Sequence, residues 1–556
     1  MVTKTYRIII DIHVINCYIR SHNNAYASPQ TPMYLDISTL QRNGRTYQRV
    51  LLRESYRQNG KVKKRTIANL SACSHEEIEA IQLALRHKHD LAQLGSVEQD
   101  LMVQQGPSVG AVWLVYQVAR RLGIASALGN SREGKLALWQ VIARTIDQGS
   151  RLSAVRLAGH HAACDVLDLG PFHEEHLYAN LDWLKAHQVE IENKLFRKVS
   201  AGQRTELFLY DVTSSYLEGE KNQLAAFGYN RDGKKGKRQI VIGLLCEREG
   251  TPLSIEVFKG NTQDTQSFAS QVSKVAERFG GGAVTFVGDR GMIKGPQIEQ
   301  LKAYEDHEFH YITAITKPQI EKLLAQGDIQ IGLFDQALAE VQVEEDLRYV
   351  LRRNPSRAEE IKRTREDKYQ ALRRSVDEQN RYLHEHPRAT LEVARRKIEH
   401  KSQKLKIDNW VVVSSEQRTI SLSKDHEKLQ EIAKLDGCYA IRTDLSTAAA
   451  CKELVHQRYK DLALVEWAFR TSKTVQLEMR PIHVRLADRT RAHAFVVMMA
   501  YRIVKELASC WRSIELTVEE GLKELDALCV TEVSIPGQGS YHRIPEPRDL
   551  SRHCLL

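Results

Sequence analysis

The sequence predicts a multidomain α/β protein with a mixed sheet at its centre. Four apolar runs between residues 207 and 288 have the length of buried strands, and turns and one amphipathic helix connect them. Segments with a helical period precede this region over residues 75–200 and return near residue 446. The 556 residues suffice for about three or four domains. A hydrophobic fraction of 42% excludes a wholly disordered chain.

Composition also excludes several classes of protein. Nine cysteines without a CxxC pair do not suit a disulfide scaffold or a zinc ribbon, and they do suit a reducing cytoplasm. No apolar run reaches the roughly 18 residues that span a bilayer, so we expect no membrane segment. The net charge of +10 permits nucleic acid as a partner without establishing it.

The first predicted module is a small basic sheet over residues 33–74. Three alternating segments are separated by the Asn-Gly pairs at 43–44 and 59–60, which are strong hairpin signals. Residues 42–65 carry nine Lys or Arg and one Glu, a net charge of +8. This basic face is either solvated surface or a DNA contact. Residues 1–32 read as an extension that need not be native, with Met33 as a candidate start.

Residues 75–204 are predicted to hold four or more helices. Gly123 and Gly149 stand where two of these helices would end. A helical region of this kind can place a helix in a DNA groove, and a plain scaffold would show the same periodicity.

The central sheet region is expected in two parts, residues 205–317 and 437–510. Between them lies a predicted insertion over residues 318–436, and residues 511–556 are expected to form a helical tail. Within the insertion, a β-like stretch comes first, followed by polar helices over residues 356–406. These helices hold 15 Lys or Arg and 9 Asp or Glu, a net charge of +6, which is typical of a solvated surface.

Two aspartates follow apolar runs of the predicted sheet. Asp211 ends the run ELFLYD, and Asp289 ends the run AVTFVGD. Acids at the same end of neighbouring strands converge on one sheet edge, where paired carboxylates can hold divalent cations. Taken singly, each aspartate is more simply interpreted as the cap of the next turn.

A third acid, Glu466, lies in a predicted helix with Tyr459 and Lys473 seven residues away on either side. Seven residues return a side chain to nearly the same helix face, so the three line one stripe. Such a stripe is not an apolar core seam. It belongs either to a functional site or to an exposed face with an ordinary ion pair.

Four segments occur in an order known from one protein family. YDVTSSY (residues 210–216), FKGNTQDTQSF (258–268) and VGDRGM (287–292) resemble its first-acid motif, its Gly-Asn-Thr turn and its second-acid motif. YKDLALVEWAFRTSK (459–473), followed by RPIHV, resembles its Tyr-Arg-Glu-Lys signature. The family is that of the DDE transposases of bacterial insertion sequences, in the IS-four-like group with an insertion before the catalytic Glu. The resemblance spans roughly residues 205–485.

This resemblance implies an RNase H-like catalytic core with an insertion domain ahead of the Glu helix. It implies that Asp211, Asp289 and Glu466 are catalytic and hold two Mg²⁺ ions, which Mn²⁺ can replace, with Asp211 shared between the two metals. Water would first attack at the element's end and free a 3′-OH. That hydroxyl would then attack the target DNA.

DNA contacts are expected around these acids. The signature Arg position holds Leu462, and Arg470 on the same helix is a candidate for its role. The loop 231–238 has a net charge of +4 and is either a phosphate-binding loop or a plain hairpin tip. The residues expected to meet DNA are Tyr459, Lys473, Arg470, Arg290, Lys234, Lys235, Lys237 and Arg238.

The resemblance therefore predicts a transposase that binds element ends, cuts DNA and joins it. The partners would be double-stranded DNA, both ends and target, and a second copy of the chain in a homodimer. Residues 75–204 would be the end-binding part, and the location would be cytoplasmic and nucleoid-associated in a bacterium. Two alternatives stay open: a metal-dependent DNA nuclease on the same fold, and an inactive DNA-binding relic. The concentrated basic segments predict DNA binding that weakens steeply with salt.

Overall fold

The computed structural model describes residues 33–42, 45–58, 61–88, 102–200, 205–279, 283–474, 476–479, 482–535 and 539–555. The predicted extension 1–32 and both Asn-Gly turns lie outside the described residues. The chain forms two compact units. The first contains Met1–Val118, Leu152–Phe172 and Glu506–Leu556, and the second contains Ala119–Arg151 and His173–Lys505.

The predicted three-stranded basic sheet is present in the first unit. β1 (Met33–Arg42), β2 (Arg45–Gln58) and β3 (Lys61–Asn69) pair antiparallel in that order. α2 (His75–Arg86) follows, and a capping box between Ser74 and Glu77 satisfies backbone donors at its start.

The prediction that residues 511–556 are a helical tail is wrong. η4 (Trp511–Ile514), α18 (Val518–Asp526) and α19 (Asp549–Leu555) are helical, but β15 (Cys529–Ile535) and β16 (Gly539–Arg543) lie between α18 and α19. These strands form a three-stranded sheet in the order β16-β15-β4 with β4 (Met102–Ser108). Because β4 lies far away in the sequence, this pairing leaves no local signal.

The helices predicted over residues 75–204 are present but belong to both units. Gly123 adopts a φ of 78° between two of them, which fits its predicted role as a helix stop. The elements are α3 (Gly110–Arg121), α4 (Ile124–Leu128), α5 (Arg132–Ile146), α6 (Arg151–His160), α7 (Ala163–Leu167) and α8 (Glu174–Ser200).

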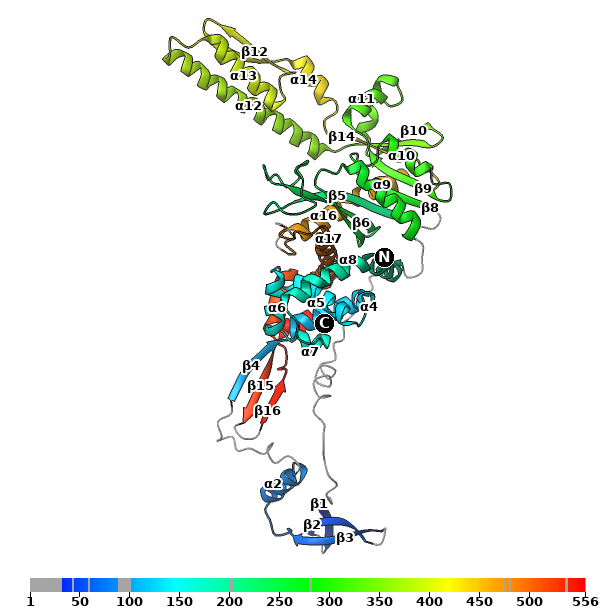
Figure 1. Ribbon diagram of the computed structural model, residues 1–556, viewed down its shortest axis with the longest axis vertical. Coiled ribbons are helices and arrows are strands. Elements are labelled where there is room, and N and C mark those ends of the chain that lie inside the picture. Colours follow the sequence, from blue (N-terminus) through cyan, green and yellow to red (C-terminus); the bar gives the residue numbers. More distant parts are fainter. Residues whose placement is uncertain are drawn as a thin grey trace. The chain divides into compact units, whose positions relative to one another are not determined.

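An eight-stranded mixed sheet forms the centre of the second unit (Figure 1), in the order β10-β11-β14-β9-β8-β5-β6-β7. β5, β6 and β7 pair antiparallel, whereas β5, β8 and β9 run parallel. This order and these directions are those of an RNase H-like core, as predicted. The strands are β5 (Leu207–Tyr216), β6 (Gln239–Glu247), β7 (Pro252–Lys259), β8 (Ala283–Gly288) and β9 (Glu308–Ala314).

Three further strands continue this sheet: β10 (Ala339–Glu344), β11 (Leu347–Arg353) and β14 (Cys438–Thr443). The strands expected inside the insertion 318–436 therefore extend the core sheet, and α11 (Lys317–Gln326) and η3 (Ile331–Asp335) lead into them. What separates from the sheet is the segment between β11 and β14.

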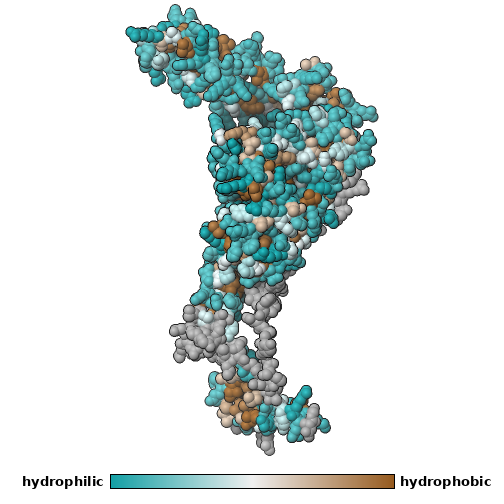
Figure 2. Space-filling view, viewed as in Figure 1, coloured by the Kyte–Doolittle hydropathy of each residue, from teal (hydrophilic) through white to brown (hydrophobic). Residues whose placement is uncertain are grey.

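That segment has a small hydrophobic core of its own. Leu372, Ile398 and Trp410 are buried in it, while its surface is largely hydrophilic (Figure 2). Its elements are α12 (Pro355–Glu385), α13 (Leu391–Leu405), β12 (Val411–Glu416), β13 (Thr419–Lys424) and α14 (His426–Ala433).

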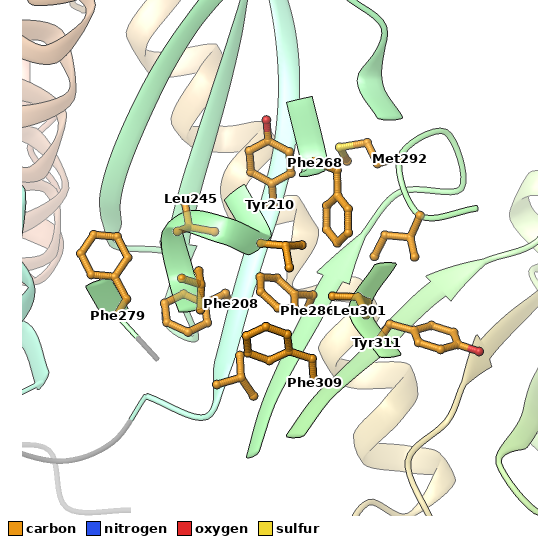
Figure 3. Close-up of a cluster of buried hydrophobic side chains, with 14 of the residues drawn as sticks. Phe208, Tyr210, Leu245, Phe268, Phe279, Phe286, Met292, Leu301, Phe309 and Tyr311 are labelled. Carbon is orange, nitrogen blue, oxygen red and sulfur yellow. The ribbon is translucent and has the colours of Figure 1, made fainter. Parts of the chain in front are cut away.

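One face of the central sheet is covered by α9 (Asp264–Lys274), η2 (Val275–Phe279) and α10 (Gly295–Lys302). Phe208, Phe286 and Phe309 from three neighbouring strands meet Phe268 of α9 in its core (Figure 3). Tyr210 points into the same cluster, so strand alternation directs Asp211 to the opposite face.

Helices also cover that opposite face. α16 (Leu462–Lys473) packs against β5, and α15 (Lys452–Lys460) packs against β9. Ile242 of β6 lines a small cavity together with Phe469 of α16 and Tyr501 of α17 (Ala487–Cys510). Asp211 therefore lies on the side of the sheet that α16 covers. None of the helices in the described part of the chain is long and apolar enough to cross a membrane.

Candidate active site

The two predicted aspartates lie at equivalent positions on neighbouring parallel strands. Tyr210 of β5 pairs with Gly288 of β8, and this is the last pair of that ladder. Asp211 and Asp289 each follow directly, so both emerge at the point where β8 ends. The prediction that Asp211 ends its own strand is wrong, because β5 continues to Tyr216 through its pairing with β6.

The third acid comes from the helix that packs on β5. Glu466 is exposed on α16. The prediction of one continuous helix from Tyr459 to Lys473 is wrong, because α15 ends at Lys460 and α16 begins at Leu462. Asp461 forms the break.

Tyr459 nevertheless reaches the acids from its separate helix. Its hydroxyl donates to Oδ1 of Asp289 at 3.5 Å. Burial raises the pKa of Tyr459, and the Asp289 carboxylate adds to this shift. Tyr459 therefore contacts a candidate metal ligand, and its contact with DNA stays a prediction.

The three carboxylates act on one another electrostatically. The pKa of half-buried Asp211 is raised to about 7, first by burial and then by the charges of Asp289 and Glu466. The backbone N–H of Val212, which donates to Oδ1 of Asp211 at 2.8 Å, opposes the rise, and so does Arg231. These acids therefore concentrate negative charge at one place on the sheet.

The chemistry of this donor set fits a hard divalent cation. Mg²⁺ prefers carboxylate oxygens, and three elements each supply one carboxylate here. Within the described residues, no three His, Cys, Asp or Glu side chains lie close enough to form a closed metal cluster. A bound cation would draw the carboxylates together and offset their repulsion.

Most cationic side chains expected to meet DNA are exposed. Arg290 directly follows Asp289, and Arg470 lies one turn beyond Glu466 on α16. In the loop between β5 and β6, Lys237 pairs with Glu218 at 2.7 Å. The exposed residues of that loop are Lys234, Lys235, Lys237 and Arg238.

Lys473 is placed differently from its neighbours. Its Nζ lies 3.0 Å from Oδ1 of Asp232, and both side chains are largely buried. The pair joins α16 to the loop that follows β5. Contact between Lys473 and a DNA phosphate remains a prediction.

Three charged residues near the acids were not singled out from the sequence. Nη2 of Arg231 donates to both carboxylate oxygens of Asp264 in the first turn of α9, at 2.6 and 2.7 Å. Asp232 accepts the backbone N–H of Tyr216 at 3.0 Å, which ties the loop to β5. The sequence held a signal for each aspartate. Asp232 is the single acid of a basic loop, and Asp264 is the only acid of the segment FKGNTQDTQSF.

Comparison with known proteins gives two family matches. Residues 35–99 match the family described as IS1634 family transposase, N-terminal domain. Residues 202–503, more than half of the chain, match the family described as Transposase DDE domain. No curated protein matches the chain.

Among solved structures, the chain resembles the piggyBac transposase in a synaptic complex with hairpin DNA. The similarity covers 81% of this chain and 82% of that one at 8% sequence identity, with a TM-score of 0.34.

Proposed function

This chain belongs to the DDE transposases of bacterial insertion sequences, and from that membership we propose that it cuts DNA at element ends and joins those ends to target DNA. DDE domains depend on divalent metal in general. We propose Asp211, Asp289 and Glu466 as the catalytic residues and Mg²⁺ as the metal. One observation carries the assignment: Asp211 and Asp289 directly follow the two residues of the last pair in one parallel ladder, and the helix that bears Glu466 packs against the strand of Asp211.

The metal would supply activation of an attacking oxygen and stabilisation of the leaving oxygen. The three carboxylates would hold it. Tyr459 would fix the orientation of the Asp289 carboxyl through its hydrogen bond. The exposed guanidinium groups of Arg290 and Arg470 would receive the phosphates beside the acids.

The same acids would serve two transfers in sequence. In the first, a water oxygen bonds to phosphorus, the strand breaks at the element's end, and a 3′-OH leaves. In the second, that 3′-OH bonds to a target phosphorus and a target 3′-oxygen leaves. Because each step exchanges one P–O bond for another, neither requires an oxidant or a covalent protein intermediate.

The proposed substrates are double-stranded element ends and target DNA, with a homodimer as the active complex. The exposed basic loop between β5 and β6 and the basic helices α12 and α13 support a polyanionic partner. We also propose the nucleoid as the cellular location, which a fluorescent fusion would test.

Strand joining is the decisive assay. Duplexes carrying the inverted repeats that flank the coding region would be incubated with plasmid target and Mg²⁺. We expect cleaved ends and joined products from the wild type, and neither from Asp211→Asn. Asp306→Asn, an exposed aspartate before β9, is the matched control and should retain both.

Other outcomes would assign other functions. Cleavage without any joined product would identify a nuclease on this fold, and DNA binding without cleavage would identify an inactive relic. Cleavage that survives Asp211→Asn would overturn the assignment of the site.

A further inference from the structure

Two aromatic side chains are unusually exposed in the loop between β5 and β6. Phe227 is 64% exposed and Tyr229 is 81% exposed, and a single glycine separates them. Large aromatic rings are ordinarily buried or used at interfaces, since exposing them to water forgoes much hydrophobic stabilisation. Both rings are therefore candidates for contact with a ligand.

The backbone that carries these rings is closely packed. A Cβ at Gly228 would stand 2.1 Å from the carbonyl oxygen of Gly260, so only glycine fits between the two rings. The side-chain amide of Gln239 donates to the carbonyl of Tyr229 at 3.0 Å and to that of Gly260 at 2.9 Å. The rings thus project from a constrained segment, which reduces the entropy lost on binding.

A guanidinium group lies over each ring. Arg238 is 5.6 Å from the ring centre of Phe227, and Arg231 is 5.5 Å from that of Tyr229. Arg231 is itself held by Asp264, whose two carboxylate oxygens both accept from its Nη2. Aromatic rings flanked by cations are the combination that binds bases by stacking and phosphates by charge.

The loop is attached to two of the three elements that supply the acids, β5 and α16. Asp232 accepts the backbone N–H of Tyr216 in β5 and pairs with Lys473 in α16. Tyr216 pairs with Gln239 and lies five residues beyond Asp211 on the same strand. At about 3.3 Å per residue, Asp211 and Tyr216 are about 16 Å apart along β5, which is about five steps of a DNA strand at 3.4 Å each. The ring-bearing segment meets the sheet at this end of β5, because Gln239, the partner of Tyr216, donates its side-chain amide to the carbonyl of Tyr229.

We propose that Phe227 and Tyr229 form a stacking platform for unpaired DNA bases within about five nucleotides of the cleaved phosphate. The proposal rests on the proposed function, since it takes the acids as the cleavage site. Every base offers a π-face, so the platform favours unpaired over paired DNA and does not depend on base sequence. The net charge of +4 in residues 231–238 favours DNA over a basic protein partner.

Binding in EDTA tests the platform without any cleavage. The probes are a 30-base-pair duplex with a four-nucleotide mismatched bubble containing 2-aminopurine, and the same duplex fully paired. We expect wild-type protein to quench the bubble fluorescence. Phe227→Ala/Tyr229→Ala should abolish the quench and weaken bubble binding by about 5- to 100-fold. Its affinity for paired DNA should stay within about twofold, because phosphate contacts dominate there.

Matched variants separate stacking from general damage. Phe227→Tyr/Tyr229→Phe keeps both rings and should retain the quench. Tyr541→Ala removes an exposed ring from the other compact unit and should also retain it. Thermal unfolding checks that the double alanine variant is folded.

The proposal is overturned if the double alanine variant quenches like the wild type, as it would if the rings served a protein partner. Equal losses on bubble and paired DNA would also overturn it. The Mg²⁺ strand-joining assay reports independently on the function. Wild-type joining with no stacking effect refutes only the platform, and stacking without joining refutes only the transposase chemistry.

Discussion

Replacing Gly260 by alanine should release the aromatic loop from the central sheet. Gly260 is the glycine of the Gly-Asn-Thr turn that follows β7. A Cβ there would stand 1.9 Å from the carbonyl oxygen of Gln239 and 2.6 Å from that of Ala226. Both neighbours are backbone atoms, which cannot rotate aside as a side chain can. One of the two backbone segments must therefore move by more than about 1 Å to restore a 3.0 Å contact between the Cβ and the carbonyl oxygen.

Four hydrogen bonds cross this contact and set the magnitude. Ala226 and Gln239 exchange backbone bonds of 3.1 and 3.0 Å, Gly260 donates to Leu224 at 3.0 Å, and the Gln239 amide donates to Gly260 at 2.9 Å. At about 1 kcal/mol each, the loss of between two and all four of these bonds predicts a local destabilisation of about 2–4 kcal/mol. The core cluster around Phe286 lies outside this contact and should persist.

Limited trypsin digestion measures the effect where it occurs. Lys234 and Lys235 lie in the loop, and we expect their cleavage in Gly260→Ala to accelerate at least about tenfold, as local opening of this size implies. Gly332→Ala is the control, since its Cβ would meet no atom within 4 Å. Equal digestion of both variants would show that the backbone approach does not hold the loop, and the reasoning would fail.

Three further outcomes follow from the structure. Phe286→Ala removes a fully buried ring at the sheet centre and should cost about 3–5 kcal/mol in urea unfolding, and a cost below about 1 kcal/mol would contradict the packing described. Replacing Lys234, Lys235 and Lys237 together by Gln should lower the slope of log affinity for DNA against log salt by up to about 2.7, and an unchanged slope would exclude phosphate contact by this loop. The hydrogen bond to Asp444 raises the pKa of His310, so the protonated imidazole stabilises the folded state. This stabilisation is complete below the unfolded pKa of about 6.5 and is lost as the pH rises through the raised pKa of the folded state. The thermal midpoint should therefore fall more between pH 6 and pH 8.5 in the wild type than in His310→Gln, and equal falls would remove His310 as the cause.

The acid pair was predictable because its signals are local. Each aspartate follows an apolar run, and a parallel ladder aligns the ends of two such runs. The polar helices α12 and α13 were equally predictable, because their sequences combine a high content of charged residues with a helical period. In both regions, the pattern within one continuous segment of sequence was enough to predict the structure of that segment.

Features that depend on distant partners were missed. Lys473 was expected to meet DNA or to form an ordinary ion pair along its own helix, but its partner Asp232 lies 241 residues earlier. β15 looked like part of a helical tail, but it pairs with the distant strand β4 on one side and with β16 on the other. The break at Asp461 was also missed, because helical residues continue on both sides and periodicity carries through the turn.

The segment between β11 and β14 enters and leaves the sheet through neighbouring antiparallel strands. Arg353 pairs with Cys438, and the N–H of Asn354 bonds to the carbonyl of Gly437 at 2.8 Å. Paired residues of such strands lie only about 5 Å apart, so a two-residue turn could span the same gap. Residues 354–437 thus behave as a cassette at the tip of a hairpin. We expect that they can be shortened, exchanged or replaced by a reporter domain while the sheet that aligns the acids keeps its register.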